Sequence, residues 1–159
     1  MPDIKNIEAA IALSKEDESK VLGLTIGAQK VKVTPGQHIP KGEAQLAPEL
    51  SFNGAATGTT YIVIGIDLDA PFPSFSVLSP ILHWLQPGLK PTDGTTNLIA
   101  PDDAPFIADY AGPGPPPPSS PHRYVFLLYE QPVGFDPARF APPGGKKMGI
   151  RPRMRETNT

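Results

Sequence analysis

The sequence contains no cysteine among its 159 residues. Disulfide bonds and zinc sites built on thiolates are therefore excluded, and nothing in the composition indicates an oxidising compartment. Charged residues make up only 19% of the chain and the formal net charge is -2. Such a chain offers no basic surface to attract DNA or RNA, so we expect no nucleic-acid partner.

Long apolar runs are also missing. None approaches the roughly 20 consecutive apolar residues that a membrane-spanning helix needs, and the N-terminus lacks the basic start and apolar core of a secretory signal. We therefore predict a cytoplasmic protein without a transmembrane segment. Apolar residues make up 39% of the chain, which suits a globular protein, and we expect a single domain over residues 1–159.

Proline is abundant, with 22 residues, and 15 glycines accompany it. Because proline has no N–H donor, it is excluded from helix interiors and from central strands. So many prolines must lie in turns, edges and ordered loops between short strands. The composition therefore predicts a mainly β fold.

Helical spacing is clear near the N-terminus, where Ile4, Ile7 and Ile11 predict one short amphipathic helix over residues 3–13. A second short helix is predicted around residues 137–140. The tail over residues 141–159 is basic and poorly patterned, and we assign it no structure.

Strand patterns occupy the middle of the chain. Alternating apolar residues predict half-buried strands within residues 23–33. The run 61–68 is apolar except at Gly65 and Asp67, which predicts a strand covered on both faces in the middle of a sheet. Two more apolar runs begin at Ile81 and Tyr124, and we predict that the second is another central strand.

Polar residues stand where these apolar runs begin or end. Asp67 and Asp69 close the first run, and strand alternation places them on the same side. His83 lies in the second run, and His122 with Arg123 precedes the third. If these segments converge, they form a pocket with two carboxylates and two imidazoles.

Each of these residues also has a purely structural interpretation. An Asp-x-Asp pair is more often a turn signal or a cap than a site, and His83 beside Trp84 is as typical of a core histidine as of a site. Arg123 can pair with one of the aspartates, and the proline-rich segment before His122 can serve as a rigid spacer. The residues alone leave these alternatives open.

Metal and hydrolase sites are not predicted. Two histidines and a carboxylate can hold a metal, but the sequence has no H-x-H or H-x-x-x-H pair to supply two ligands from one element. It also has no G-x-S-x-G motif and no cysteine nucleophile, which argues against a hydrolase triad. We therefore expect no metal and no cofactor.

Three motifs resemble the signatures of a known family. "DLDAP" at 67–71, "LHW" at 82–84 and "GPGPPPPSSPHRYVFLLYEQ" at 112–131 are similar, in order and spacing, to the signature regions of the phosphatidylethanolamine-binding protein family. These regions span residues 61–90 and 108–131, and their sequences look most like those of filamentous fungal members. The resemblance implies a β-sandwich, in which a large central antiparallel sheet packs on a smaller one with few short peripheral helices. It also implies a small anion pocket at one end.

The resemblance also assigns residues by motif. It implies that the ligand is bound by Asp67, His83, Pro115, Pro116, His122 and Tyr124. It implies structural support from Asp69, Pro71 and Arg123. The stiff proline segment then acts as a preformed pocket wall, which lowers the entropy lost on binding. One departure stands out, because relatives often carry an aromatic residue before H-W that is absent here, unless Phe72 or Phe75 replaces it.

Two functions follow from the resemblance. The first is a noncatalytic protein that binds a phosphate- or carboxylate-bearing ligand, with a regulatory or inhibitory role towards a protein partner such as a protease or a kinase. The alternative is an enzyme of fungal secondary metabolism that couples or cyclises anhydride- or polyketide-type substrates. Asp67, His83 and His122 are then its acid and base groups, and Phe72, Phe75 and Tyr110 form an apolar rim.

Overall fold

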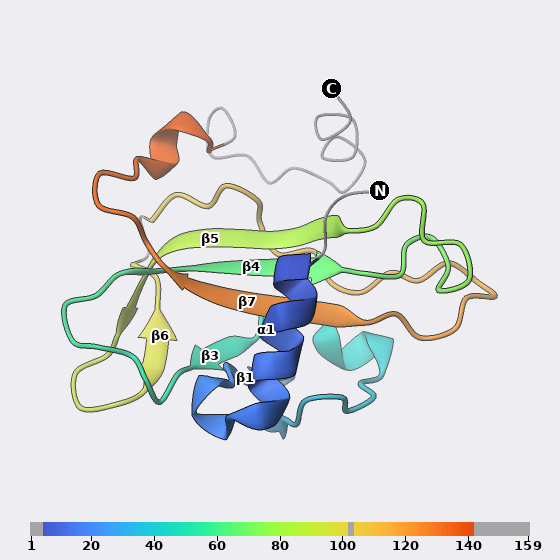
Figure 1. Ribbon diagram of the computed structural model, residues 1–159, viewed down its shortest axis with the longest axis horizontal. Helices are drawn as coiled ribbons and strands as arrows, with labels where there is room; N and C mark the ends of the chain where they lie inside the picture. The colour runs from blue at the N-terminus through green and yellow to red at the C-terminus, as the bar shows by residue number, and fades with distance from the viewer. Residues whose placement is uncertain (1–4, 102–103, 142–159) are drawn as a thin grey trace.

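The computed structural model describes residues 5–101 and 104–141, and these form a mainly β structure (Figure 1). The elements with their bounds are α1 Lys5–Glu16, η1 Glu18–Lys20, β1 Gly23–Ile26, β2 Val31–Val33, η2 Lys41–Ala44, β3 Glu49–Ser51, β4 Tyr61–Asp67, β5 Ile81–Pro91, β6 Asn97–Ile99, β7 Tyr124–Glu130 and η3 Pro137–Arg139. The mainly β fold with few helices is confirmed. All but the first residue of the C-terminal tail, 141–159, lies outside the described residues.

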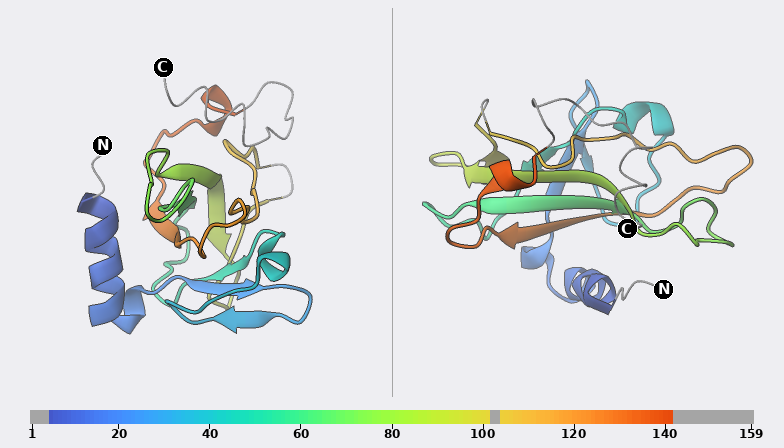
Figure 2. Two further views of the ribbon diagram at one scale, coloured as in Figure 1. Left: turned by 90° about the vertical axis from the view of Figure 1, so that its right-hand side faces the viewer. Right: turned by 90° about the horizontal axis from the view of Figure 1, so that it is seen from above.

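Helix α1 is amphipathic, as its spacing predicts. Ile7, Ala10, Ile11 and Ser14 are its half-buried residues, and they repeat at intervals of three and four. Ile4, the first residue of the predicted stripe, lies outside the described part. The helix lies beside the sheet on the side of β7 (Figures 1 and 2). Among the described residues, no helix is long and apolar enough to cross a membrane.

The seven strands form one antiparallel, hydrogen-bonded sheet in the order β2-β1-β3-β6-β5-β4-β7. The long strands β4, β5 and β7 lie side by side, and β1 and β2 run across their direction (Figure 2). The sheet therefore curls on itself, and the two layers expected as separate sheets are continuous through β5. The resulting core contains Leu50, Tyr61, Val63, Trp84, Leu89 and Leu98.

The sheet curls at strand β5, and this strand contains a buried proline. Pro87 is fully buried within the strand, although proline was predicted to avoid central strands. The register between β4 and β5 shifts at this point, and Gly88 has a φ of 82°. The missing N–H of Pro87 therefore falls at an irregularity, after which β5 pairs with β6 through Lys90 and Pro91.

Strand β7 is an edge strand, so the prediction of a central strand was wrong. It pairs only with β4 among the described strands, and its residues are half-buried or exposed rather than buried. Phe126 and Leu128 supply apolar cover to the core from this edge. An apolar run indicates that side chains are packed against the core. It does not indicate whether the strand has a neighbour on both sides.

Gly65 allows two aromatic rings to meet across β4. It lies opposite Trp84 of β5 and Phe126 of β7, whose rings are 6.4 Å apart in an edge contact. A Cβ at Gly65 would lie 3.1 Å from the Phe126 ring and 3.2 Å from Trp84 Cβ. The absence of a side chain here is therefore a packing requirement of the central strand.

Asp69 and Arg123 tie the end of β4 to the start of β7. The Arg123 backbone N–H donates to Asp69 Oδ2 at 2.7 Å, and the guanidinium donates from Nε at 2.9 Å and from Nη2 to Oδ1 at 2.7 Å. The Asp69 side chain is 3% exposed, whereas that of Arg123 is 74% exposed. The hydrogen bond from the Arg123 side chain is the main cause that lowers the pKa of Asp69 below its ordinary value of 3.8.

We expect Asp69→Ala to lower the free energy of unfolding at neutral pH by about 1–3 kcal/mol, because the Arg123 N–H loses its acceptor in a partly buried setting. Because the pKa of Asp69 is lowered in the folded state, its stabilising effect is fully present above 3.8 and is lost as the pH falls below that value. Urea unfolding of both proteins between neutral and strongly acidic pH measures the difference.

Arg123→Ala is the matched control, since it removes only the exposed guanidinium and keeps the backbone hydrogen bond. We expect it to cost no more than about 1 kcal/mol, like loss of the exposed Lys30–Glu49 pair. An equal cost for Asp69→Ala and Arg123→Ala, or a difference from wild type that does not shrink in acid, contradicts this account.

Candidate functional site

The candidate site lies where β4 ends and where β5 and β7 begin, at the right-hand end of Figure 1. In the sheet register, Asp67 lies opposite Ile81 of β5 and Tyr124 of β7. The loops that follow β4 and precede β7 lie beside this end and face the viewer in the left panel of Figure 2. Residues that are far apart in the sequence are therefore brought together by strand pairing.

Asp67 is the buried acidic residue at the centre of the cluster. Its Oδ2 lies 2.8 Å from His122 Nδ1 and 4.0 Å from His83 Nε2. Its Oδ1 accepts the Asp69 backbone N–H at 2.8 Å. A buried carboxylate needs such partners, because desolvation of an isolated charge is costly. The structure therefore brings the three residues of the predicted acid–base set together.

His83 is held in one tautomer by the backbone. Its Nδ1 lies 2.7 Å from the Ala111 carbonyl oxygen, which can only accept, so Nδ1 carries a proton. The Nε2 atom faces Asp67 and can offer a second N–H only when the imidazole is charged. The ring also packs edge-on against Tyr124, with centroids 5.2 Å apart.

Tyr124 brings a buried hydroxyl that has no partner. Among the described residues, its oxygen is the buried side-chain polar atom without a hydrogen bond. Burial first, and then the negative charge of Asp67, raise the pKa of Tyr124, so the hydroxyl keeps its proton. Asp67 lies near enough to act on this hydroxyl, yet among the described residues no group forms a hydrogen bond of good geometry with it.

The expected supporting residues lie next to this cluster. Asp69 and Arg123 form the ion pair described above, and Pro71 follows Ala70 through a cis peptide bond in the turn after β4. The expectation that Asp67 and Asp69 point to one side assumed that the strand continues to Asp69. Strand β4 ends at Asp67, so alternation no longer applies at Asp69, and the two carboxylates bind different partners.

Ser119 contacts the cluster, and the sequence analysis did not predict it. Its Oγ lies 2.9 Å from His122 Nε2 and 2.9 Å from the Ser120 carbonyl oxygen. Its N–H donates to the Pro116 carbonyl at 2.7 Å, closing a turn through the proline-rich loop. The available signal was a serine three residues before a histidine on a proline-rich turn, a spacing that matches no common motif.

The other predicted wall residues divide into two groups. Pro115 and Pro116 are half-buried in the loop beside the cluster, and Phe75 is 61% exposed in the loop after β4. Tyr110 does not form an open rim. Its ring packs edge-on against Trp84 at 5.7 Å, its hydroxyl donates to the Ala44 carbonyl, and burial raises its pKa to about 12.

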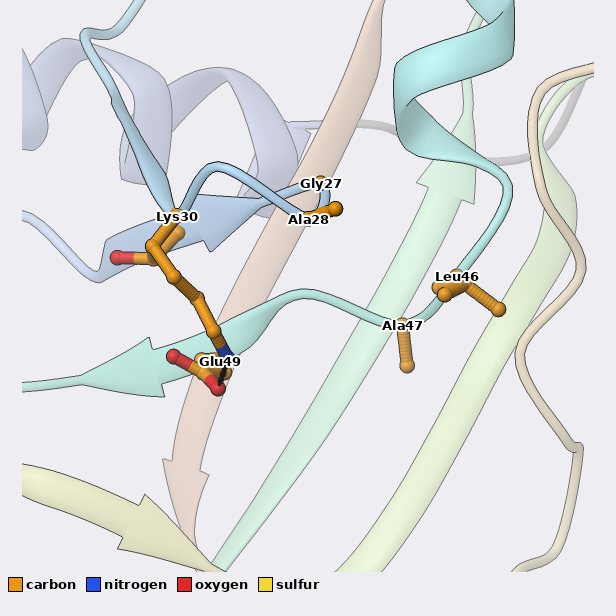
Figure 3. Close-up of a pocket in the computed structure, with 7 residues that line it drawn as sticks. Gly27, Ala28, Lys30, Leu46, Ala47 and Glu49 are labelled. Atoms are coloured by element: carbon orange, nitrogen blue, oxygen red, sulfur yellow. Dashed lines mark hydrogen bonds and ion pairs between the residues drawn. The ribbon is translucent and has the colours of Figure 1, made fainter.

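Two surface cavities lie away from this cluster, around the turn between β1 and β2. One of about 230 Å³ is lined by Gly27, Ala28, Leu46 and Ala47, and the Lys30–Glu49 ion pair lies at its edge (Figure 3). The other, of about 420 Å³, shares several of these residues and extends to Val31 and Gln45. Neither contains a member of the Asp67 cluster. Within the described residues, no group of three or more potential ligands is arranged to hold a metal ion.

Relatives with similar sequences are found in yeast, a filamentous fungus and a plant. The carboxypeptidase Y inhibitor of Saccharomyces cerevisiae is 35% identical over 51% of this chain and 42% of its own length. The phomoidride biosynthesis cluster protein N of Talaromyces stipitatus is 33% identical over 75% of this chain and 65% of its own length. The protein FLOWERING LOCUS T of Arabidopsis thaliana is 30% identical over 72% of this chain and 60% of its own length. The chain thus spans less than two thirds of the length of each relative.

The fold is also that of a solved relative. The structure of carboxypeptidase Y inhibitor complexed with its cognate proteinase superposes with a TM-score of 0.66 at 24% identity, covering 95% of this chain and 89% of that one. The sequence profile of the phosphatidylethanolamine-binding protein family matches residues 29–158. This chain therefore belongs to the phosphatidylethanolamine-binding protein family.

Proposed function

We propose that the chain binds a phosphate- or carboxylate-bearing ligand at the Asp67 cluster, which comprises Asp67, His83, His122 and Tyr124. The observation that carries this proposal is the buried Tyr124 hydroxyl, which is protonated and has no partner among the described residues. A buried donor without an acceptor costs free energy unless a bound group satisfies it. An anionic oxygen is the acceptor that gains most from such a site.

The charge of Asp67 has to be offset before an anion can approach. His122, in contact with its Oδ2, supplies that compensation when it is protonated. Both ring nitrogens of His122 are engaged, by Asp67 and Ser119, so Tyr124 and the Nε2 of His83 are the donors left for a ligand. Pro115 and Pro116 form the adjoining wall in this proposal.

We expect Tyr124→Phe to weaken binding of phosphate or phosphorylethanolamine by about 2- to 10-fold, the effect of one lost hydrogen bond. The free energy of unfolding should change little, because the removed hydroxyl makes no hydrogen bond among the described residues. Titration followed by the NMR signals of the histidine side chains measures the binding, and urea unfolding measures the stability.

Tyr129→Phe is the control, because Tyr129 is 47% exposed and lies near the other end of β7. It should bind like the wild type. If saturating phosphate leaves the His83 signals unmoved, or if both tyrosine variants bind equally well, the anion proposal fails.

A protein partner is the regulatory form of this proposal, and the relatives favour a protease over a kinase. One relative is a carboxypeptidase inhibitor, and the structural match is a complex of that inhibitor with its proteinase. The loop after β4 exposes Phe75 and Val77, each 61% exposed, and Leu78, 46% exposed, beside the cluster. Exposed apolar side chains grouped in this way are typical of a protein-binding surface.

We expect micromolar concentrations of the chain to slow peptide hydrolysis by carboxypeptidase Y. Phe75→Ser should raise the inhibition constant by about tenfold or more, because a central aromatic anchor contributes at least about 1.4 kcal/mol. Val133→Ser is the control, since Val133 is fully exposed beyond the far end of β7. An enzyme that works at its full rate in the presence of the chain rules out this partner.

An enzymatic role is the second candidate, supported by the relative from the phomoidride biosynthesis cluster. The contact of 2.8 Å between Asp67 and His122, with His83 beside it, can donate and accept protons in the coupling or cyclisation of anhydride- or polyketide-type substrates. Here the cluster acts on a ligand rather than only holding it.

This role predicts that His122→Ala changes the metabolites that the native host produces, because the proton-transfer pair is broken. Mass spectrometry of extracts from hosts that carry the wild type or the variant makes the comparison, with Tyr129→Phe as the neutral control. An unchanged product profile at equal protein level removes the enzymatic candidate.

A further inference from the structure

Ser119, His122 and Asp67 form a continuous hydrogen-bonded chain. Ser119 Oγ lies 2.9 Å from His122 Nε2, and His122 Nδ1 lies 2.8 Å from Asp67 Oδ2. These contacts have the connectivity of a nucleophile, a general base and an orienting carboxylate. The missing G-x-S-x-G motif excludes one structural context for such a triad, and it does not exclude the geometry on another fold.

The base and the carboxylate are buried more deeply than the hydroxyl. The side chains of His122 and Asp67 are 2% and 5% exposed, whereas Ser119 is half-buried on the loop that precedes β7. The base is therefore shielded from water, and the hydroxyl lies nearer the surface. Because the proline-rich turn ends at Ser119, the loop presents this hydroxyl next to His122.

The orientation of His122 is set by Asp67. The ionised carboxylate can only accept, so it holds the proton on Nδ1 and leaves Nε2 free to receive one from Ser119. Asp67 is itself fixed by the Asp69 N–H at 2.8 Å. In the neutral state of His122, the Ser119 hydroxyl donates to Nε2, and in the charged state it turns to the Ser120 carbonyl at 2.9 Å.

We propose that Ser119 is a nucleophile that reacts with small activated acyl esters, with His122 as its general base and Asp67 as the positioning residue. Ser119 Oγ attacks the acyl carbon and passes its proton to His122 Nε2. The bond to the leaving oxygen then breaks, and Nε2 returns the proton to that oxygen, so an alcohol or a phenol leaves and His122 is neutral again. Water then attacks the acyl-serine, His122 takes one of its protons, and the released Oγ regains a proton from Nε2. The carboxylic acid and the free serine are restored without any other reactant.

This inference does not depend on anion binding, because it concerns the hydroxyl of the loop rather than the Tyr124 donor. The described residues show no pair of backbone N–H groups assigned to the developing oxyanion. We therefore expect formation of a covalent adduct to be more prominent than rapid turnover.

The test uses the whole chain with an alkyl fluorophosphonate and with p-nitrophenyl acetate. We expect the fluorophosphonate to label Ser119 at least about 100-fold faster than Ser120, the gain that a positioned general base supplies. Tryptic peptides analysed by mass spectrometry locate the adduct, and release of p-nitrophenolate gives the acylation rate. Ser119→Ala should lose both signals, and Ser120→Ala, the adjacent control, should keep both.

Asp67→Asn tests the positioning role through the tautomer. The amide nitrogen would face Nδ1, so the proton of His122 would move to Nε2 and the base would be blocked. We expect labelling at least about 100-fold slower, with a rate that no longer rises across the range in which imidazole loses its proton. The groups that face His122 in the wild type are Asp67, Asp69, Tyr124 and Ser119.

Each outcome decides the proposal. Selective labelling of Ser119 that is lost in Ser119→Ala and slowed in Asp67→Asn supports it. Labelling of Ser119 no faster than that of Ser120, or an Asp67→Asn variant that reacts at the wild-type rate with the same pH profile, overturns it.

Discussion

The antiparallel register of β4 with its two neighbours is the constraint on which the site depends. Asp67 lies opposite Tyr124 on one side and Ile81 on the other, which also brings His83 and His122 within reach of its carboxylate. A slip of one residue would turn every side chain of β4 to the other face. The buried residues on both faces of β4 make such a slip costly, so the core fixes the geometry of the polar cluster.

The polar cluster is stable because almost every buried group in it has a partner. Asp67 accepts from the backbone and contacts His122, and His83 donates to the Ala111 carbonyl. Among the residues that the structure describes, the Tyr124 hydroxyl is the exception, and buried polar groups without a partner are rare in folded proteins. The same end of the sheet therefore contains a hydrogen-bonded network and one buried hydroxyl without a hydrogen bond.

Local sequence patterns predicted α1 and the long strands, but they did not predict β3 and β6 or show which strands are neighbours. The period of three to four in α1 and the apolar run of β4 depend on residues close in sequence, so they could be interpreted directly. The edge position of β7 and the buried Pro87 in β5 depend on which strand lies alongside, and no local pattern contains that information. The mainly β fold was predicted from proline and from motif resemblance, and the continuity of the sheet through β5 required the structure.

For the site, the sequence predicted which residues come together but not how they are hydrogen-bonded. The motifs led to Asp67, His83, His122 and Tyr124, and the structure brings these side chains together. Their hydrogen-bonding states could not be predicted, because the tautomer of His83 is set by the carbonyl of Ala111, which any residue could supply. Ser119 was missed for the related reason that its contact with His122 depends on the path of the proline-rich loop.

The loop between Ala108 and β7 has a consequence for how such a protein can diversify. It is anchored to β5 through the Leu85–Ala108 bridge and the hydrogen bond from Ala111 to His83, and between these points and Tyr124 it contributes no strand. Its length and side chains can therefore change without altering any strand pairing of the scaffold. Descendants of one ancestral chain can acquire new chemical specificities by changing residues 112–121 of this loop, while His83, His122 and Asp67 are inherited intact.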